Sequence, residues 1–143
     1  MKTPLRFVLP LLMLAAGTAF AGESFVIVER ASNEVTLHRG KKADALGDLI
    51  VFANPVYDAG NHAQVGTDEG YCIRVVVGKS WECFWTLQLK DGQITSQGPD
   101  FDSRDSTMIV TGGSGRYAGA RGVLTVHPRP DKETAYDFRY ELL

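Results

Sequence analysis

The apolar residues of this chain recur mainly at every second position, in short runs separated by Gly, Asn, Asp and Pro. This alternation is typical of strands with one buried face, whereas a helix places apolar residues three or four positions apart. The pattern predicts strands over 24–31, 48–58, 71–77, 81–89, 93–98, 107–112, 122–128 and 134–143. A further short candidate strand covers 33–39, and 59–70 has the composition of a hairpin or loop.

About eight short strands at hairpin spacing, with no long helical segment, indicate a sandwich or a closed barrel. Closure is favoured because it removes exposed strand edges. An eight-stranded barrel is just wide enough to be filled by side chains or to hold one small ligand. We therefore expect an all-β fold: an eight-stranded antiparallel β-barrel with a central cavity.

The first residues differ in character from the rest of the chain. Lys2 and Arg6 precede an apolar run at 7–16, and "AFA" at 19–21 has small residues at both key positions. These features predict a signal peptide over 1–21, cleaved after Ala21, because the run is too short for a membrane anchor of roughly 20 apolar residues. The mature protein, 22–143, is then one domain that is secreted or periplasmic.

The charge of the mature chain limits its partners. Removing Lys2 and Arg6 leaves 13 basic and 17 acidic residues, a formal charge of −4. No basic run remains, so neither nucleic acid nor an anionic membrane is an expected partner. No second apolar span follows, and we expect a soluble product.

The glycine-rich stretch "VTGGSGRYAGARG" at 110–122 has three interpretations. A dinucleotide fingerprint requires a helix directly after it, but the residues that follow are strand-like. A nucleophile elbow needs Gly two positions after its serine, where Ser114 has Arg116. The structural interpretation remains: the glycines permit positive φ and a tight reversal at a barrel corner. Tyr117 is then expected to pack across one end of the barrel.

Metal and cofactor chemistry find little support in the sequence. His38, His62 and His127 are far apart and show no zinc-like spacing with Cys, Asp or Glu. We expect no metal and no cofactor.

Cys72 and Cys83 are the only cysteines. If Val77 and Gly78 form the turn between their two strands, Cys72 faces Cys83 and both side chains lie on one face of the hairpin. That geometry allows a disulfide, which suits an oxidising compartment. Two reduced, buried cysteines are the alternative.

Two further features bear on a site. The strand over 81–89 carries Trp81, Cys83, Trp85, Leu87 and Leu89 on one face. Such side chains either fill a core or line a ligand pocket. Glu29 shares a strand face with Phe25 and Ile27, so an inward orientation puts a carboxylate at the barrel mouth, suited to act as a base or to stabilise positive charge. An exposed glutamate at a strand end is the alternative.

Three pieces of the chain occur together in one known family. They are "GDLIVFANPVYDAG…VGTDEGYC" at 47–72, "GQITSQGP" at 92–99 and "IVTGGSGRYAGARGVLTV" at 109–126. In this order they resemble the allene oxide cyclase family, whose barrel the dirigent proteins share more distantly. The resemblance implies an eight-stranded antiparallel barrel with a hydrophobic cavity. Family members are often trimers or dimers, so the resemblance also allows a homo-oligomer.

The resemblance assigns roles to particular residues. The family's cavity asparagine, in a Phe-x-Asn-x-x-Tyr stretch, falls on Asn54, and its cavity cysteine falls on Cys72. Its aromatic residue after Gln-Gly-Pro is replaced here by Asp100. The expected catalytic residues are Glu29 and Asn54, and the expected substrate-binding residues are Phe52, Tyr57, Cys72, Trp81 and Trp85. A Cys72–Cys83 bridge would remove the cavity thiol.

Two functions follow from the resemblance. The plant cyclases close a fatty-acid epoxide into a ring by holding it folded in a dry cavity, and dirigent proteins steer radical coupling. We expect the barrel to bind a small apolar ligand and to steer its cyclisation or isomerisation by preorganisation. The alternative is a non-catalytic dirigent-like or ligand-carrying barrel.

Overall fold

In the part of the chain that the structure describes, the fold consists of nine β-strands and no helix. A computed structural model describes residues 22–41, 43–130 and 134–143, so the expected signal peptide lies outside the described residues. The strands are β1 (Ser24–Arg30), β2 (Glu34–Leu37), β3 (Leu49–Tyr57), β4 (Gln64–Val76), β5 (Ser80–Leu89), β6 (Gly92–Phe101), β7 (Ser106–Gly115), β8 (Gly122–Pro128) and β9 (Ala135–Leu142).

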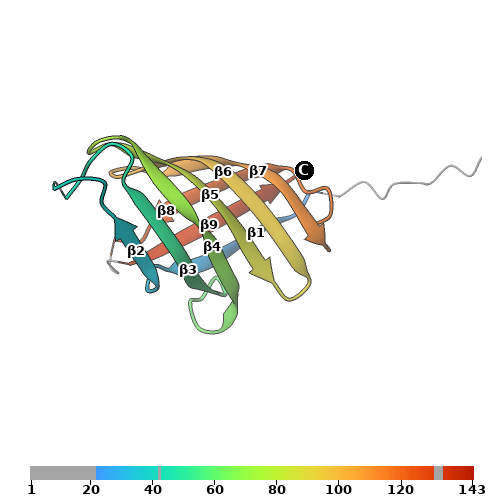
Figure 1. Cartoon of the computed structure of the whole chain (residues 1–143). Helices are drawn as coiled ribbons and strands as arrows, with labels where there is room; N and C mark the ends of the chain where they lie inside the picture. Colours follow the sequence, from blue (N-terminus) through green and yellow to red (C-terminus); the bar gives the residue numbers. More distant parts are fainter. Residues whose placement is uncertain (1–21, 42, 131–133) are drawn as a thin grey trace, which may run out of the picture.

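The sheet closes on itself, as Figure 1 shows. Each strand from β3 to β9 pairs with the next in antiparallel register, and β1 pairs with both β9 and β3. The short β2 pairs with residues 49–52 of β3, on the same edge of β3 that β1 meets at Val56 and Tyr57. The prediction of an eight-stranded antiparallel barrel is therefore confirmed, with β2 as one extra strand.

Alternation along each strand builds the core inside the barrel. On β5, Cys83, Trp85 and Leu87 are at most 3% exposed. Side chains that point to one face of a strand lie two residues apart, and in a closed barrel that face is the interior. Trp85 stacks on Phe138 of β9 at 5.3 Å between ring centroids. The inward face predicted for 81–89 is thus present.

β4 is longer than the sequence pattern indicated. It begins at Gln64, whereas the composition of 59–70 predicted a hairpin or loop. The prediction was wrong because Gly66 and Gly70 do not form a turn. They allow the backbone of β4 to lie close to β5. A Cβ at Gly66 would collide with the Gln88 carbonyl oxygen, and one at Gly70 with the Phe84 carbonyl oxygen and with Trp85.

The β4–β5 hairpin pairs Cys72 with Cys83 as predicted, but through a different turn. Val76 pairs with Ser80 rather than with Lys79, and the register shifts between Arg74 and Val76. The expected two-residue turn was wrong because a bulge absorbs one extra residue in β4.

The glycine-rich stretch closes the end of the barrel away from β2. Gly115 adopts a φ of 59°, and a Cβ there would collide with the Asp91 carbonyl oxygen. Tyr117 follows, is 6% exposed, and lies 6.2 Å from the Phe25 ring. The structural interpretation of these glycines and the expected position of Tyr117 at one end agree with this arrangement.

Candidate functional site

A cavity of about 270 Å³ opens at the other end of the barrel. Its wall comes from the end where β1, β6 and β8 finish and where β5, β7 and β9 begin. Four carboxylates face it: Glu29, Glu34, Asp100 and Asp102. Its rings are Phe52, Trp81, Trp85, Phe101, Tyr136 and Phe138.

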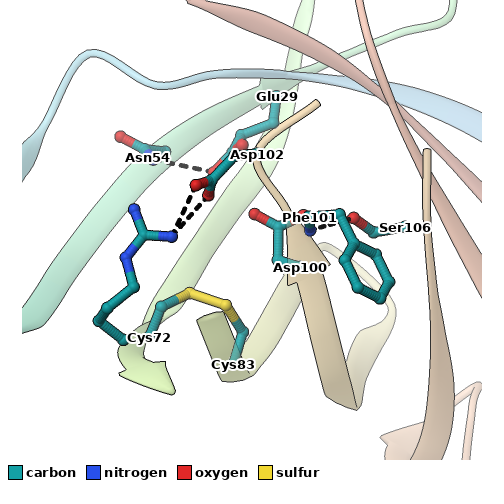
Figure 2. Close-up of a disulfide and its surroundings, with 9 residues drawn as sticks. Glu29, Asn54, Cys72, Cys83, Asp100, Phe101, Asp102 and Ser106 are labelled. Atoms are coloured by element: carbon teal, nitrogen blue, oxygen red, sulfur yellow. Dashed lines mark hydrogen bonds and ion pairs between the residues drawn. A yellow bond between two sulfur atoms is a disulfide. The ribbon is translucent and has the colours of Figure 1, made fainter. Parts of the chain in front are cut away.

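Glu29 and Asn54 form a hydrogen-bonded pair in the cavity wall (Figure 2). The Asn54 side-chain nitrogen donates to Oε1 of Glu29 at 2.8 Å. The Asn54 side-chain oxygen accepts from the backbone N–H groups of Ser32 at 3.1 Å and Asn33 at 2.9 Å. The turn after β1 therefore fixes the orientation of the amide, because a flipped amide would place N–H against N–H.

The barrel holds Glu29 as a weak acid. Its side chain is almost wholly buried, and this burial raises its pKa from 4.5 to about 7. The hydrogen bond from Asn54 opposes the shift, while the negative charges of Glu34 and Asp100 add to it. A carboxyl poised near neutrality can both accept and return a proton, as general acid–base catalysis requires.

The raised pKa of Glu29 predicts a pH-dependent stability. Glu29 binds its proton more tightly in the folded state than in the unfolded chain. Its contribution to the free energy of unfolding is therefore complete below pH 4.5 and is lost as the pH rises to about 7. The free energy of unfolding should fall by about 3 kcal/mol across this window because of Glu29 alone. Urea unfolding of wild type and Glu29→Gln at pH 4 and pH 8 isolates this part. Equal pH dependence in the two proteins would contradict it.

Asp100 and Glu34 make the cavity acidic. The Ser106 hydroxyl donates to Asp100 at 2.7 Å and accepts from the Phe101 backbone N–H at 2.8 Å. Burial raises the pKa of Asp100, and the Ser106 hydrogen bond partly opposes this. Burial also raises the pKa of Glu34. In their ionised form these carboxylates can stabilise a positive charge in the cavity.

Arg74 lies at the edge of the cavity and contacts three segments there. Its guanidinium contacts Asp102 at 2.7 Å and Asp44 at 2.8 Å, and lies 3.9 Å from the centroid of the Trp81 ring. Asp102 is therefore neutralised by an ion pair, unlike the carboxyls described above. The network ties β4, the β6–β7 loop and the loop before β3 together around the opening.

The disulfide Cys72–Cys83 joins β4 and β5 next to the cavity (Figure 2). Its sulfurs are bonded at 1.97 Å and the two Cα atoms are 4.1 Å apart. Cys72 lines the cavity, so it presents a disulfide sulfur and not a thiol to a ligand. Nucleophilic or acid chemistry by this cysteine is therefore excluded while the bridge is intact.

Most of the residues expected from the sequence meet in this one cavity. Tyr57 does not, because its odd separation from Asn54 puts it on the other face of β3. The Arg30 guanidinium lies 3.7 Å from the centroid of the Tyr57 ring. Tyr57 therefore lies outside the cavity wall, contrary to the expectation that it binds substrate. The residues brought together are Glu29, Phe52, Asn54, Cys72, Trp81 and Trp85.

Sequence reasoning missed Glu34, Tyr136 and the role of Asp100. Asp100 was visible only as a departure from the family's aromatic residue, and the structure places it in the cavity wall. Tyr136 lies on β9, which meets β1 only because the barrel closes. No local pattern carries that long-range contact.

The described residues offer no cluster of three or more His, Cys, Asp or Glu side chains arranged to hold a metal ion. Across 22–41, 43–130 and 134–143, no helix could span a membrane.

Known structures share this barrel. A pyocyanin demethylase is 25% identical, with a TM-score of 0.71 over 82% of this chain and 99% of that one. A pterocarpan synthase dirigent protein is 13% identical, with a TM-score of 0.66 over 87% of this chain and 94% of that one. The Diels–Alderase AbmU from Streptomyces koyangensis is 14% identical, with a TM-score of 0.67 over 85% of this chain and 63% of that one.

The family model described as allene oxide cyclase matches residues 24–129, which include β1 through β8 and both members of the Glu29–Asn54 pair. The chain belongs to the allene oxide cyclase family.

Proposed function

We propose that this protein is an exported barrel that binds a small, largely apolar ligand and steers its cyclisation or isomerisation, with Glu29 as acid and base. The observation that carries the proposal is the buried Glu29–Asn54 hydrogen bond in the wall of an aromatic cavity. The carboxyl can transfer a proton, and the rings hold an apolar molecule against it.

The geometry favours catalysis by preorganisation. The ring of Phe52 meets Trp85 edge-on at 6.0 Å, and Trp85 is stacked on Phe138, so the floor of the cavity is rigid. A ligand pressed against this floor loses its conformational freedom before it reacts. A charge that forms on the ligand then finds Glu29 and Asp100 already in place, which needs no rearrangement in the transition state.

The pyocyanin demethylase supports this proposal, since its name describes an enzyme with the same barrel and 25% identity. A non-catalytic ligand carrier would use the same cavity, but it has no need of a carboxyl held near neutrality. The disulfide supports export, because such bonds persist in oxidising compartments.

Ligand binding is tested by filling the cavity. Ala31→Trp puts a large ring into the wall, and Ile109→Trp puts the same ring on the outer face of β7, where Ile109 is 67% exposed. Wild type and Ile109→Trp, purified from their native export route, should retain a small apolar molecule in native mass spectrometry. Ala31→Trp should lose it while keeping the wild-type circular dichroism spectrum. A ligand retained equally by all three would refute binding in this cavity.

A further inference from the structure

A second group of polar side chains lies deeper in the barrel and does not belong to the cavity wall described above, except for Trp85. We call Asp68, Trp85, Ser96 and Tyr140 the inner polar site. Each is at most 3% exposed. Among the described residues, five of their polar atoms have no hydrogen-bond partner: both carboxyl oxygens of Asp68, the indole nitrogen of Trp85 and the hydroxyl oxygens of Ser96 and Tyr140.

The four side chains come together from four strands. Ser96 of β6 pairs directly with Trp85 of β5. Tyr140 follows Phe138 by two residues on β9, so both rings point inward, with Tyr140 farther from the opening. Burial raises the pKa of Tyr140 and the charge of nearby Asp68 adds to this effect, while the Trp85 indole and the Ser96 hydroxyl, which lie close to the Tyr140 oxygen without forming a well-aligned hydrogen bond, oppose it. The unpartnered atoms therefore share one small region of the interior.

This region also adjoins the catalytic pair. Asp68 is the cross-strand partner of Asn54. Asn54 gives one of its amide N–H bonds to Glu29, so its amide stands between the two carboxyls. Burial raises the pKa of Asp68 well above its usual value, and the negative charges of Glu29 and Glu69 act in the same direction.

Buried polar atoms rarely stay without partners, and ordered water commonly supplies them. The indole can only donate, the hydroxyls donate and accept, and a protonated carboxyl does both. A set with this mixture fits a small neutral molecule that also donates and accepts. It does not fit a cation, since the site offers one carboxyl only.

We propose that the inner polar site binds water and holds Asp68 as a neutral acid, so that Glu29 is the one of the two carboxyls beside Asn54 that ionises. Asp68 then adds no negative charge beside Glu29. The groups facing it are Glu29 from β1, Tyr140 from β9 and Glu69 of its own strand. The water site does not depend on the proposed function. The consequence of this site for catalysis does rest on that function.

Nuclear magnetic resonance of the wild-type protein tests both parts. The carboxyl carbon of Asp68 should keep the chemical shift of an acid from pH 5 to pH 8, and the Trp85 indole proton should show cross-relaxation with long-lived water. An Asp68 carboxyl that ionises with an ordinary midpoint, or an indole proton without water contact, would overturn the proposal. Neither measurement depends on turnover.

Asp68→Asn, which keeps the shape and removes the acid, tests the link to Glu29. Because Asp68 is neutral, this variant should leave the titration midpoint of Glu29 and the pH profile of activity almost unchanged, as should the exposed control Glu69→Gln. A midpoint that falls by about one pH unit or more in Asp68→Asn alone would show that Asp68 is ionised. Activity that survives Glu29→Gln would defeat the proposed function and leave the result for Asp68 intact.

Discussion

Replacing Glu29 by Gln should reduce turnover of a cyclisable or isomerisable ligand by about 10²- to 10⁴-fold, the range that a positioned acid or base supplies. Gln keeps an oxygen for the Asn54 N–H, which donates to Oε1 at 2.8 Å in the wild type. The cavity should keep its shape, and the dissociation constant of the ligand should change little. The loss is therefore expected in kcat, measured at saturating ligand.

Glu141→Gln is the matched control, since Glu141 is exposed on β9 and lies outside the cavity wall. It should turn over ligand at the wild-type rate. A Glu29→Gln variant with wild-type kcat would remove Glu29 from the mechanism and favour a barrel that only binds and orients its ligand.

Trp85→Ala should lower the free energy of unfolding by about 3–5 kcal/mol, the usual result of truncating a buried aromatic ring. Trp85 is 3% exposed, stacks on Phe138 and meets Phe52 edge-on. Its removal leaves a void that the opposite strands cannot close, because the sheet is a continuous ring. Urea unfolding monitored by circular dichroism measures the loss.

Trp81→Ala provides the comparison within the same strand. Trp81 is only partly buried, and one face of its ring carries the Arg74 guanidinium at 3.9 Å from the centroid. It should lose clearly less stability than Trp85→Ala. Equal losses would show that Trp85 is not the centre of the barrel's packing.

Local patterns in the sequence were sufficient to predict most strands of the barrel. Strand parity was sufficient to place Glu29 with Phe25 and Ile27, and hairpin symmetry was sufficient to oppose Cys72 and Cys83. Both relations depend only on the two-residue repeat of a strand. The turn itself was misjudged, because the bulge after Arg74 is not visible in residue types.

The remaining features were not predicted, because they depend on long-range contacts or on glycines that do not mark turns. Asp68 lies in a stretch that was interpreted as a hairpin or loop on account of its glycines, so nothing in the sequence pattern pointed its carboxyl inward. Tyr140 reaches the same region only through the closure of β9 onto β1. The polar groups of the interior depend on tertiary structure, which residue periodicity does not encode.

The locked amide of Asn54 has a stereochemical consequence. Two backbone N–H groups hold its oxygen, which directs its nitrogen to Oε1 of Glu29. Proton exchange with a guest is left to Oε2, from one direction. A planar ligand lying on the Trp85 ring would then receive the proton on a single enantiotopic face. The backbone turn after β1 would in this way determine the configuration of the product.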